Sequence, residues 1–345
     1  MENVKRVNPE TERLIRKEKG KRLAINLLPL IALIVLFSLY MVLLKANDFN
    51  IAMNLKVLVN QVIVLALVAT GAIFIFTMGS FDISLGASTL FSATIGVLAY
   101  NATGSVLVLF VVCLGVAILA SLLNSVIASV FHLPMFVTTV AMLSVLAAVA
   151  NTVITDKGVP SGTTISISVS NELRAPLEAL NTTGFKIAMI AVFALICLFV
   201  FEFTKAGRKQ KFLGGNPVCA KMTGISLSAY GILAFLMAGI GVGLGAAMTV
   251  IYTPSVSTAT AGSIGMSVFV AIVFGGMPIS GGARSRIYAA LVGGTSYMLL
   301  KQILFVLFQS VGGARDGYVQ MISAVMFLAV VFVTGMNYRT KNLPR

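Results

Sequence analysis

The sequence is poor in the residues on which soluble domains and enzymes depend. Only 10% of its 345 residues are charged, and it has one histidine, three cysteines and no tryptophan. A soluble domain of this size would be about a quarter charged, so the composition excludes one. Two of the three cysteines fall in apolar runs and the third in a basic segment. Their spacing predicts neither a disulfide framework nor a metal site, and no cofactor is expected.

Sequence motifs for catalysis are also missing. The chain has no Walker A pattern, no HExxH and no GxSxG, so we expect no catalytic residue and no enzymatic activity in it. Its net charge is +14, but no basic domain with interleaved aromatic residues accompanies that charge. Nucleic acid is therefore not an expected partner. The excess of Lys and Arg instead predicts cytoplasmic segments that face an anionic lipid bilayer.

Hydrophobic residues make up 58% of the chain, and they form long apolar runs. About 20 helical residues cross the hydrocarbon core of a bilayer. The sequence therefore predicts an all-α polytopic membrane protein with about ten transmembrane helices. The expected spans are 23–44, 58–79, a third that ends near 100, 105–131, 134–154, 185–203, 229–252, a short one at 266–274, 287–311 and 318–336. Residues 45–57, between the first two spans, are expected outside the cell as a short interfacial helix.

The basic residues set the predicted orientation. They concentrate in residues 1–22, in the island 204–228, after the eighth span and in residues 337–345. Because short basic segments stay in the cytoplasm, both termini and the island should face inward, flanking a transmembrane domain at 23–336. The external loop 155–184 contains TTISISVS, which alternates as a strand does, and NELRAPLEAL, which is typical of a surface helix.

The island 204–228 contains signals for a short helix in its second half. Asn216 is a good N-cap residue, Pro217 suits the first helical position, and Gly224 is expected to end the helix. These signals predict a short surface helix on a cytoplasmic loop.

Two glycine-rich breaks interrupt the apolar runs. MGSFDISLGAS (78–88) aligns with FGGMPISGGAR (274–284) at a constant offset of 196, which predicts internal pseudo-repeats. Paired interruptions of this kind are typical of transporters, because broken helices expose backbone groups that are tolerated only beside protein or water.

Several polar residues lie within the predicted spans or breaks. An ionisable group at such a depth costs roughly 3 kcal/mol and is a functional candidate by default. Lys301 with Gln302 either lines a path or extends its ammonium to the interface. Asp82 either braces the break or touches substrate, and Asn124 either joins helices or lines the path. The candidate path residues are Asp82, Ser84, Asn124, Ser280, Lys301 and Gln302.

Four motifs, in order, resemble a known family. GGNPVCAKMTGIS in the island is similar to the GGNPEAARLSGI-type loop in permease subunits of bacterial ABC importers for ribose, xylose, galactose and similar simple sugars. The first break resembles that family's GGIDLSVG, and the second resembles its GGTSLAGG with Pro278 as a departure. Asn124 and residues 134–139 resemble an Asn-Gly followed by PFI-A-T. The similarity covers most of residues 60–335.

This resemblance implies a coupling loop that docks into an ATP-hydrolysing subunit. The residues of the loop are Gly214, Gly215, Asn216, Pro217, Ala220, Lys221, Gly224 and Ile225. It also implies a second copy of the permease or a close homologue, an extracytoplasmic substrate-binding protein, and a multi-pass location in the bacterial cell membrane. The substrate would be a small polar molecule such as a monosaccharide.

The sequence departs from the family at informative positions. Val218 stands where the family usually has Glu, and Gly265 and Ser267 stand where relatives commonly carry Glu and Asp. The missing Glu and Asp at 265 and 267 leave a substrate other than a sugar open. The alternative function is a secondary transporter driven by an ion gradient. Such a carrier usually needs carboxylates inside its helix bundle, and Asp82 is the candidate that the sequence offers.

Overall fold

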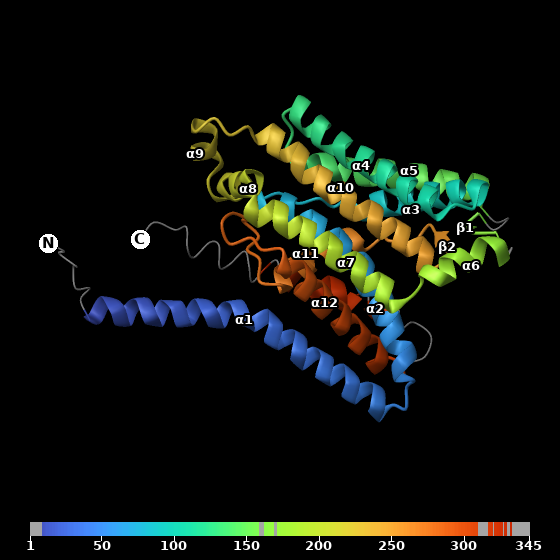
Figure 1. The fold of residues 1–345 in the computed structure, drawn as a ribbon, viewed down its shortest axis with the longest axis horizontal. Helices are drawn as coiled ribbons and strands as arrows, with labels where there is room; N and C mark the ends of the chain where they lie inside the picture. Colours follow the sequence, from blue (N-terminus) through green and yellow to red (C-terminus); the bar gives the residue numbers. More distant parts are fainter. Residues whose placement is uncertain are drawn as a thin grey trace.

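The computed structural model describes residues 9–158, 162–168, 171–309 and 317–332 except 320, 327, 330 and 331, with side chains described from Leu27 onward. Helices make up most of this part of the chain (Figure 1). Their bounds are α1 (Pro9–Ala46), α2 (Ile51–Thr77), α3 (Leu85–Thr103), α4 (Val106–Val130), α5 (Met135–Lys157), α6 (Asn171–Leu180), α7 (Thr183–Leu198), the π-helical turn η1 (Phe199–Phe203), α8 (Lys205–Gly215), α9 (Pro217–Met222), α10 (Leu227–Tyr252), α11 (Ile264–Phe274) and α12 (Tyr288–Leu307).

Seven helical segments in the described residues are long and apolar enough to cross a membrane, which makes this a multi-pass membrane protein. They are Leu27–Ala46, Ile51–Thr77, Val106–Val130, Met135–Lys157, Thr183–Phe203, Leu227–Tyr252 and Tyr288–Leu307. Each coincides with an expected span. The third and eighth expected spans are the helices α3 and α11, which are not among the seven. The tenth, 318–336, is described only in part, so the total of ten stays a prediction.

The segment between the first two spans differs from expectation. Residues 45–57 do not form a separate interfacial helix, because α2 begins at Ile51 and continues without interruption to Thr77. The side chain of Asn50 caps this helix by accepting a hydrogen bond from the Met53 amide at 3.0 Å. An N-cap at that position starts the helix outside the apolar run, and the first turns of α2 therefore carry its polar residues.

Close approach of small residues builds the centre of the bundle, where α10 lies between α2 and α4. A Cβ atom at Gly71 of α2 would lie 2.5 Å from the Met237 carbonyl oxygen, and one at Gly241 of α10 would lie 2.6 Å from that of Leu67. On the α4 side, a Cβ atom at Gly239 would lie 2.9 Å from the Cα of Ile118. Glycines at these crossings let the helix backbones touch, as is typical of helices packed inside a membrane.

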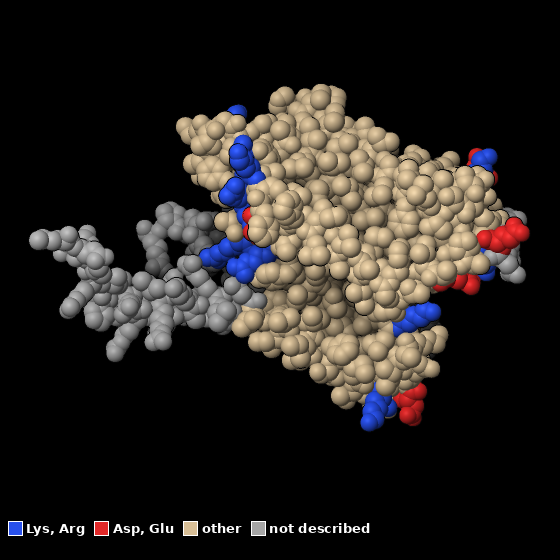
Figure 2. Space-filling view, in the orientation of Figure 1, with Lys and Arg blue, Asp and Glu red and all other residues tan. Residues whose placement is uncertain are grey.

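The two ends of the bundle have different structures. At one end, β1 (Thr164–Ser166) pairs antiparallel with β2 (Ser255–Ser257), with Ile165 opposite Val256, and α6 lies beside them. The strand and the helix predicted within residues 155–184 are thus confirmed. At the other end, α8 and α9 cap the bundle, and Lys and Arg side chains gather there (Figure 2). We call these the strand end and the basic end.

Candidate functional site

The island 204–228 folds into two helices rather than one. The expected helix is α9, and its boundaries are as predicted: Asn216 Oδ1 accepts a hydrogen bond from the Cys219 amide at 3.0 Å, Pro217 occupies the first turn, and Gly224 has a φ of 78°. The sequence analysis missed α8, which contains most of the island's basic residues. Its cap is Thr204, whose hydroxyl accepts from the Gly207 amide.

Two glycines hold α8 against the bundle. A Cβ atom at Gly207 would lie 2.0 Å from the carbonyl oxygen of Phe201 in η1, and one at Gly214 would lie 1.7 Å from that of Thr77 at the end of α2. Lys211 adds an ion pair with Glu202 at 2.7 Å. Because a side chain at either glycine would overlap backbone atoms, α8 can keep this seat only with glycine at both positions.

The end of α8 meets both glycine-rich breaks. The Gly282 amide, in the break after α11, donates a hydrogen bond to the Thr77 carbonyl at 2.9 Å. Gly79, in the break after α2, lies beside Ser280, since a Cβ atom at Gly79 would be 3.1 Å from the Ser280 carbonyl oxygen. A displacement of α8 would therefore reach α2 and the loop between α11 and α12 at once.

In contrast to α8, the short helix α9 projects beyond the nearby ends of α7 and α10 (Figure 1). Ala220 is its buried residue, whereas Val218 is 70% exposed and Met222 is 84% exposed. These two side chains are one helical turn apart and lie on the same face. An apolar pair on a helix outside the expected membrane region is typical of a surface that a partner covers.

The two breaks share the way in which their first helix ends. The amides of Gly79 and Ser80 donate to the carbonyls of Phe76 and Ile75, and the amides of Gly276 and Met277 donate in the same way to Val273 and Ile272. Both are Schellman caps, with a φ of 72° at Gly79 and 85° at Gly276.

This shared cap corrects the predicted pseudo-repeat. The equivalent glycines are 197 residues apart, not 196. The similarity ends at the cap, because Ser84 and Gly86 stand at the start of α3 whereas Ser280 and Gly282 lie in the long loop before α12. The extra loop residues in the second half contain the contacts to α8, and the two structures differ there although their sequences align.

Three of the candidate path residues form one buried cluster at the start of α3. Asp82 Oδ1 accepts hydrogen bonds from the amide and the hydroxyl of Ser84, each at 2.7 Å. Asn124 Nδ2, from α4, donates to Ser84 Oγ at 2.8 Å. All three side chains are at most 1% exposed. Their geometry braces the break against α4, which agrees with the bracing interpretation of Asp82 and the helix-joining interpretation of Asn124.

Lys301 and Gln302 lie apart from that cluster, at a cavity of about 560 Å³ near the strand end. Helices α2, α10 and α12 and the segment 260–264 surround this outer cavity. Gln302 Nε2 donates to Gln61 Oε1 of α2 at 2.8 Å. Lys301 lines the cavity, and its ammonium lies 5.9 Å from the centre of the Tyr297 ring. Ser280 belongs to neither group: it is exposed, in the loop between α11 and α12.

The sequence analysis did not single out Lys186, which is another charged residue of the strand end. It is 1% exposed, near the start of α7, and its ammonium donates to the side-chain oxygens of Asn60 and Asn181. It is the second residue of the expected span 185–203, so the rule that flagged Lys301 could have found it. With both amides bound to it, this lysine joins α7 to α2.

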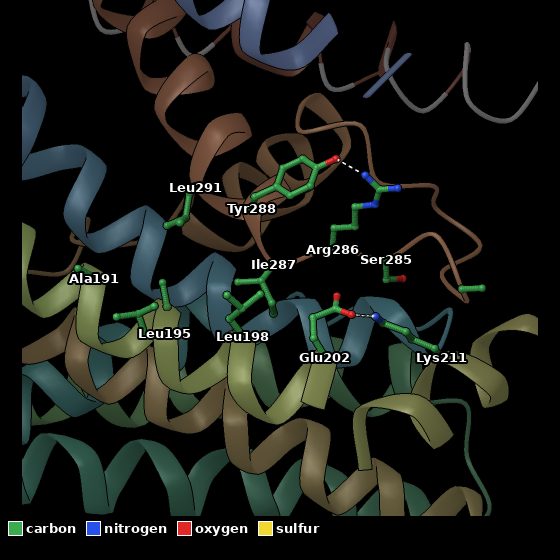
Figure 3. A pocket seen from close by; sticks show the side chains of 12 residues that line it. Ala191, Leu195, Leu198, Glu202, Lys211, Ser285, Arg286, Ile287, Tyr288 and Leu291 are labelled. Carbon is green, nitrogen blue, oxygen red and sulfur yellow. Dashed lines mark hydrogen bonds and ion pairs between the residues drawn. The ribbon is translucent and has the colours of Figure 1, made fainter. Parts of the chain in front are cut away.

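A second cavity, of about 720 Å³, opens near the basic end between α7 and α12 (Figure 3). Leu195 and Leu198 form part of its apolar wall, and the Glu202–Lys211 pair stands at its edge. Arg286 Nη1 donates to the Tyr288 hydroxyl at 2.9 Å across from that pair. This pocket contains none of the candidate path residues, so we do not place the path there.

Comparisons with known proteins give the family. Residues 54–331 match the family described as the permease component of branched-chain amino acid transport systems. The chain belongs to this permease family. Its relatives include the ribose import permease of Haemophilus influenzae (27% identical, covering 91% of this chain and 94% of the relative) and that of Escherichia coli K12 (24%; 88% and 92%). The fructose import permease of Rhizobium meliloti is 24% identical, covering 77% of this chain and 75% of the relative.

A solved structure shares the fold of this permease. A transporter described as of the metal-chelate ABC type, in an inward-facing conformation, matches with a TM-score of 0.50 and 14% identity, covering 87% of this chain and 98% of that one. The resemblance to sugar-import permeases that the four motifs predicted is confirmed by the ribose and fructose relatives. The family description names amino acids instead, so the substrate class has to be argued from the site.

Proposed function

We propose that this permease is the membrane-spanning subunit of an ABC importer, in which it forms the path of a monosaccharide or sugar derivative. ATP hydrolysis would occur in a separate ATP-binding subunit that engages the island, with residues 214–225 at the contact. The observation that carries this proposal is the position of α8, whose Gly214 touches the end of α2 while Gly282 of the second break bonds the same Thr77 carbonyl.

The proposal gives α8 and α9 separate tasks. The exposed face of α9 would bind the ATPase, and α8 would pass its displacement to both breaks. Interactions that differ between two conformational states are what allow a partner to shift the equilibrium between them. A path that opens alternately to each side then needs only small movements of α2, α3 and α11 around the braced cluster Asp82–Ser84–Asn124.

The remaining partners and the orientation belong to the same proposal. A second copy of the permease or a close homologue would complete the channel, and an extracytoplasmic binding protein would deliver substrate at the strand end. The permease would lie in the bacterial cell membrane with ten spans and both termini in the cytoplasm. The basic end would face the cytoplasm, consistent with its Lys and Arg residues. The outer cavity, with Lys301 and Gln302, would be the external part of the path.

The test is co-purification of the tagged permease from its host in mild detergent, with Gly215→Asp beside wild type. A Cβ atom at Gly215 has no atom within 4 Å, so this variant should fold. Gly184→Asp is the matched control, because Gly184 is equally open but lies near the strand end, at the start of α7. We expect an ATPase subunit with wild type and Gly184→Asp and its loss with Gly215→Asp. An ATPase absent from every sample, with transport intact, would favour the ion-driven carrier.

A further inference from the structure

The outer cavity has a lining that is polar but almost uncharged. Amides and hydroxyls from four separate segments face it: Asn54, Gln61, Thr249, Thr260, Ser263 and Gln302. Apolar side chains such as Leu65 and Met298 complete the wall. Neutral donors and acceptors on an apolar frame are what a site uses to orient a small hydroxyl-rich molecule.

Lys301 is the exception in this lining. It is the one charged residue among the described residues that border the cavity, and no carboxylate borders it. Within the described part of the chain its ammonium has no ion pair, and the centre of the Tyr297 ring lies 5.9 Å from it. Lys186, another lysine of this end, differs because its ammonium already donates to two amide oxygens.

The depth of Lys301 makes the absence of a partner significant. It is half-buried in α12, which runs from Tyr288 to Leu307, and an unpaired charge at such a position is costly. A negatively charged ligand would remove that cost and gain a charge-assisted hydrogen bond. A positively charged ligand would meet repulsion with no carboxylate to offset it.

We propose that the outer cavity selects a sugar-sized substrate that carries an anionic group, a carboxylate or a phosphate, and that Lys301 is the residue that binds this group. The neutral side chains would bind the hydroxyls of the same molecule. This inference rests on the proposed function, since it takes the cavity as the external part of the transport path. It narrows the substrate class from sugars in general to sugar acids or sugar phosphates.

A first experiment tests the charge of the cavity without any partner protein. In a Cys219→Ser background, Ser263→Cys places a thiol in the cavity, and Thr103→Cys places one at the strand end outside it; Cys113 and Cys197 are buried. The rates of labelling by an anionic sulfonate methanethiosulfonate and by its cationic trimethylammonium analogue are compared. We expect Lys301→Gln to lower the anion-to-cation ratio at Ser263→Cys about fivefold, by Coulomb interaction in a partly hydrated cavity, and Lys301→Arg to keep it.

The Thr103→Cys reference separates this effect from misfolding. The labelling ratio at Thr103→Cys should be the same with Lys, Gln or Arg at position 301. Each variant should also elute at the same volume in size-exclusion chromatography. A ratio at Ser263→Cys that does not respond to Lys301→Gln in a normally folded protein would overturn the proposal.

The second experiment uses the whole transporter, reconstituted in liposomes with its ATPase and binding protein. Matched probes are galactose with galacturonate, and ribose with ribose 5-phosphate, which distinguish carboxylate from phosphate. We expect ATP-dependent uptake of one anionic probe, reduced about tenfold by Lys301→Gln and preserved by Lys301→Arg, consistent with loss of one charged contact. ATP-dependent uptake of the neutral sugars alone, unchanged by Lys301→Gln, would overturn the inference and leave the proposed function standing. If no ATPase can be recovered, the proposed function fails, and the labelling ratio decides the inference by itself.

Discussion

The helices α8 and α9 are neighbours in the sequence, but they relate to the rest of the molecule in opposite ways. Gly207 and Gly214 seat α8 directly on the backbone of η1 and α2, and Gln210 and Leu213 are buried. In α9 the buried residue is Ala220, and its apolar face is open. The difference shows that one short island contains both a segment fixed to the bundle and an exposed apolar surface.

The same contrast separates two adjacent glycines. Gly214 has a backbone oxygen where its side chain would be, whereas Gly215 has open space. The sequence motif gives the two residues the same weight, but the structure assigns the first to packing against the bundle. A side chain at the second would meet no other atom within 4 Å. Substitutions that act on α8 alone or on α9 alone test whether the two helices have these separate roles.

The largest effect is expected from Gly214→Val. Its Cβ atom would lie 1.7 Å from the Thr77 carbonyl oxygen and 2.7 Å from the Gly282 amide nitrogen, so α8 would have to leave its seat. Overpacking against backbone should lower the free energy of unfolding by about 3 kcal/mol. Thermal unfolding in detergent measures it, with Gly215→Ala as the control that should cost nothing, because alanine is favoured over glycine in a helix. Equal melting temperatures for the two variants would show that Gly214 does not pack against the end of α2.

Loss of partner binding without loss of stability is expected from Val218→Asp combined with Met222→Asp. Both side chains are exposed, so the permease should fold normally, but two charges would replace the apolar face of α9. Removing the centre of an interface typically costs 2 kcal/mol or more, so ATPase affinity should fall by roughly 30-fold or more. Ser226→Asp is the matched control: it adds a charge nearby and preserves the cap of α10. Unchanged ATPase recovery with the double variant would show that the partner binds elsewhere.

Local signals explain which parts of this region the sequence could predict. The N-cap, proline and terminal glycine of α9 all lie within residues 216–224. The alternation of β1 and the composition of α6 are likewise local patterns, and each of these three elements agrees with its prediction. The local signal for α8 is its N-cap Thr204, whereas the contact of Gly214 with Thr77 joins residues far apart in the chain. The sequence analysis also placed the pseudo-repeat one residue out of register.

The path residues show the limit of prediction most clearly. Asp82, Lys301 and Ser280 were all candidate path residues. In the structure Asp82 belongs to the buried cluster with Ser84, Lys301 lines the outer cavity, and Ser280 lies in an exposed loop. The outer cavity combines side chains from α2, α10, α12 and the segment before α11. No spacing within one of these segments indicates that they converge, so the cavity and its single lysine follow only from the fold.

A moderate effect confined to α9 is expected from Gly224→Ala. Gly224 has a φ of 78° and no atom within 4 Å of a Cβ position, so the substitution adds backbone strain without a clash. A left-handed alanine costs about 1 kcal/mol, which would weaken the bond of the Ile225 amide to the Ala220 carbonyl, now 3.0 Å. Amide hydrogen exchange over residues 217–225 should rise while α8 stays protected. Faster exchange in α8 as well would mean that the two helices move as one unit.

The smallest effect should come from Asn216→Ala, which removes the side chain that begins α9. Its Oδ1 accepts from the Cys219 amide at 3.0 Å, and loss of such a cap costs about 1 kcal/mol of helix stability. Because Asn216 is exposed and α8 does not need this bond, the melting temperature should hardly change, whereas ATPase affinity should fall a few-fold as α9 frays. Asn216→Asp keeps an acceptor at the cap and should restore both exchange protection and affinity. A variant that binds the ATPase as well as wild type would show that α9 is held by its partner rather than by its own cap, and the contrast with α8 would then apply only to the free permease.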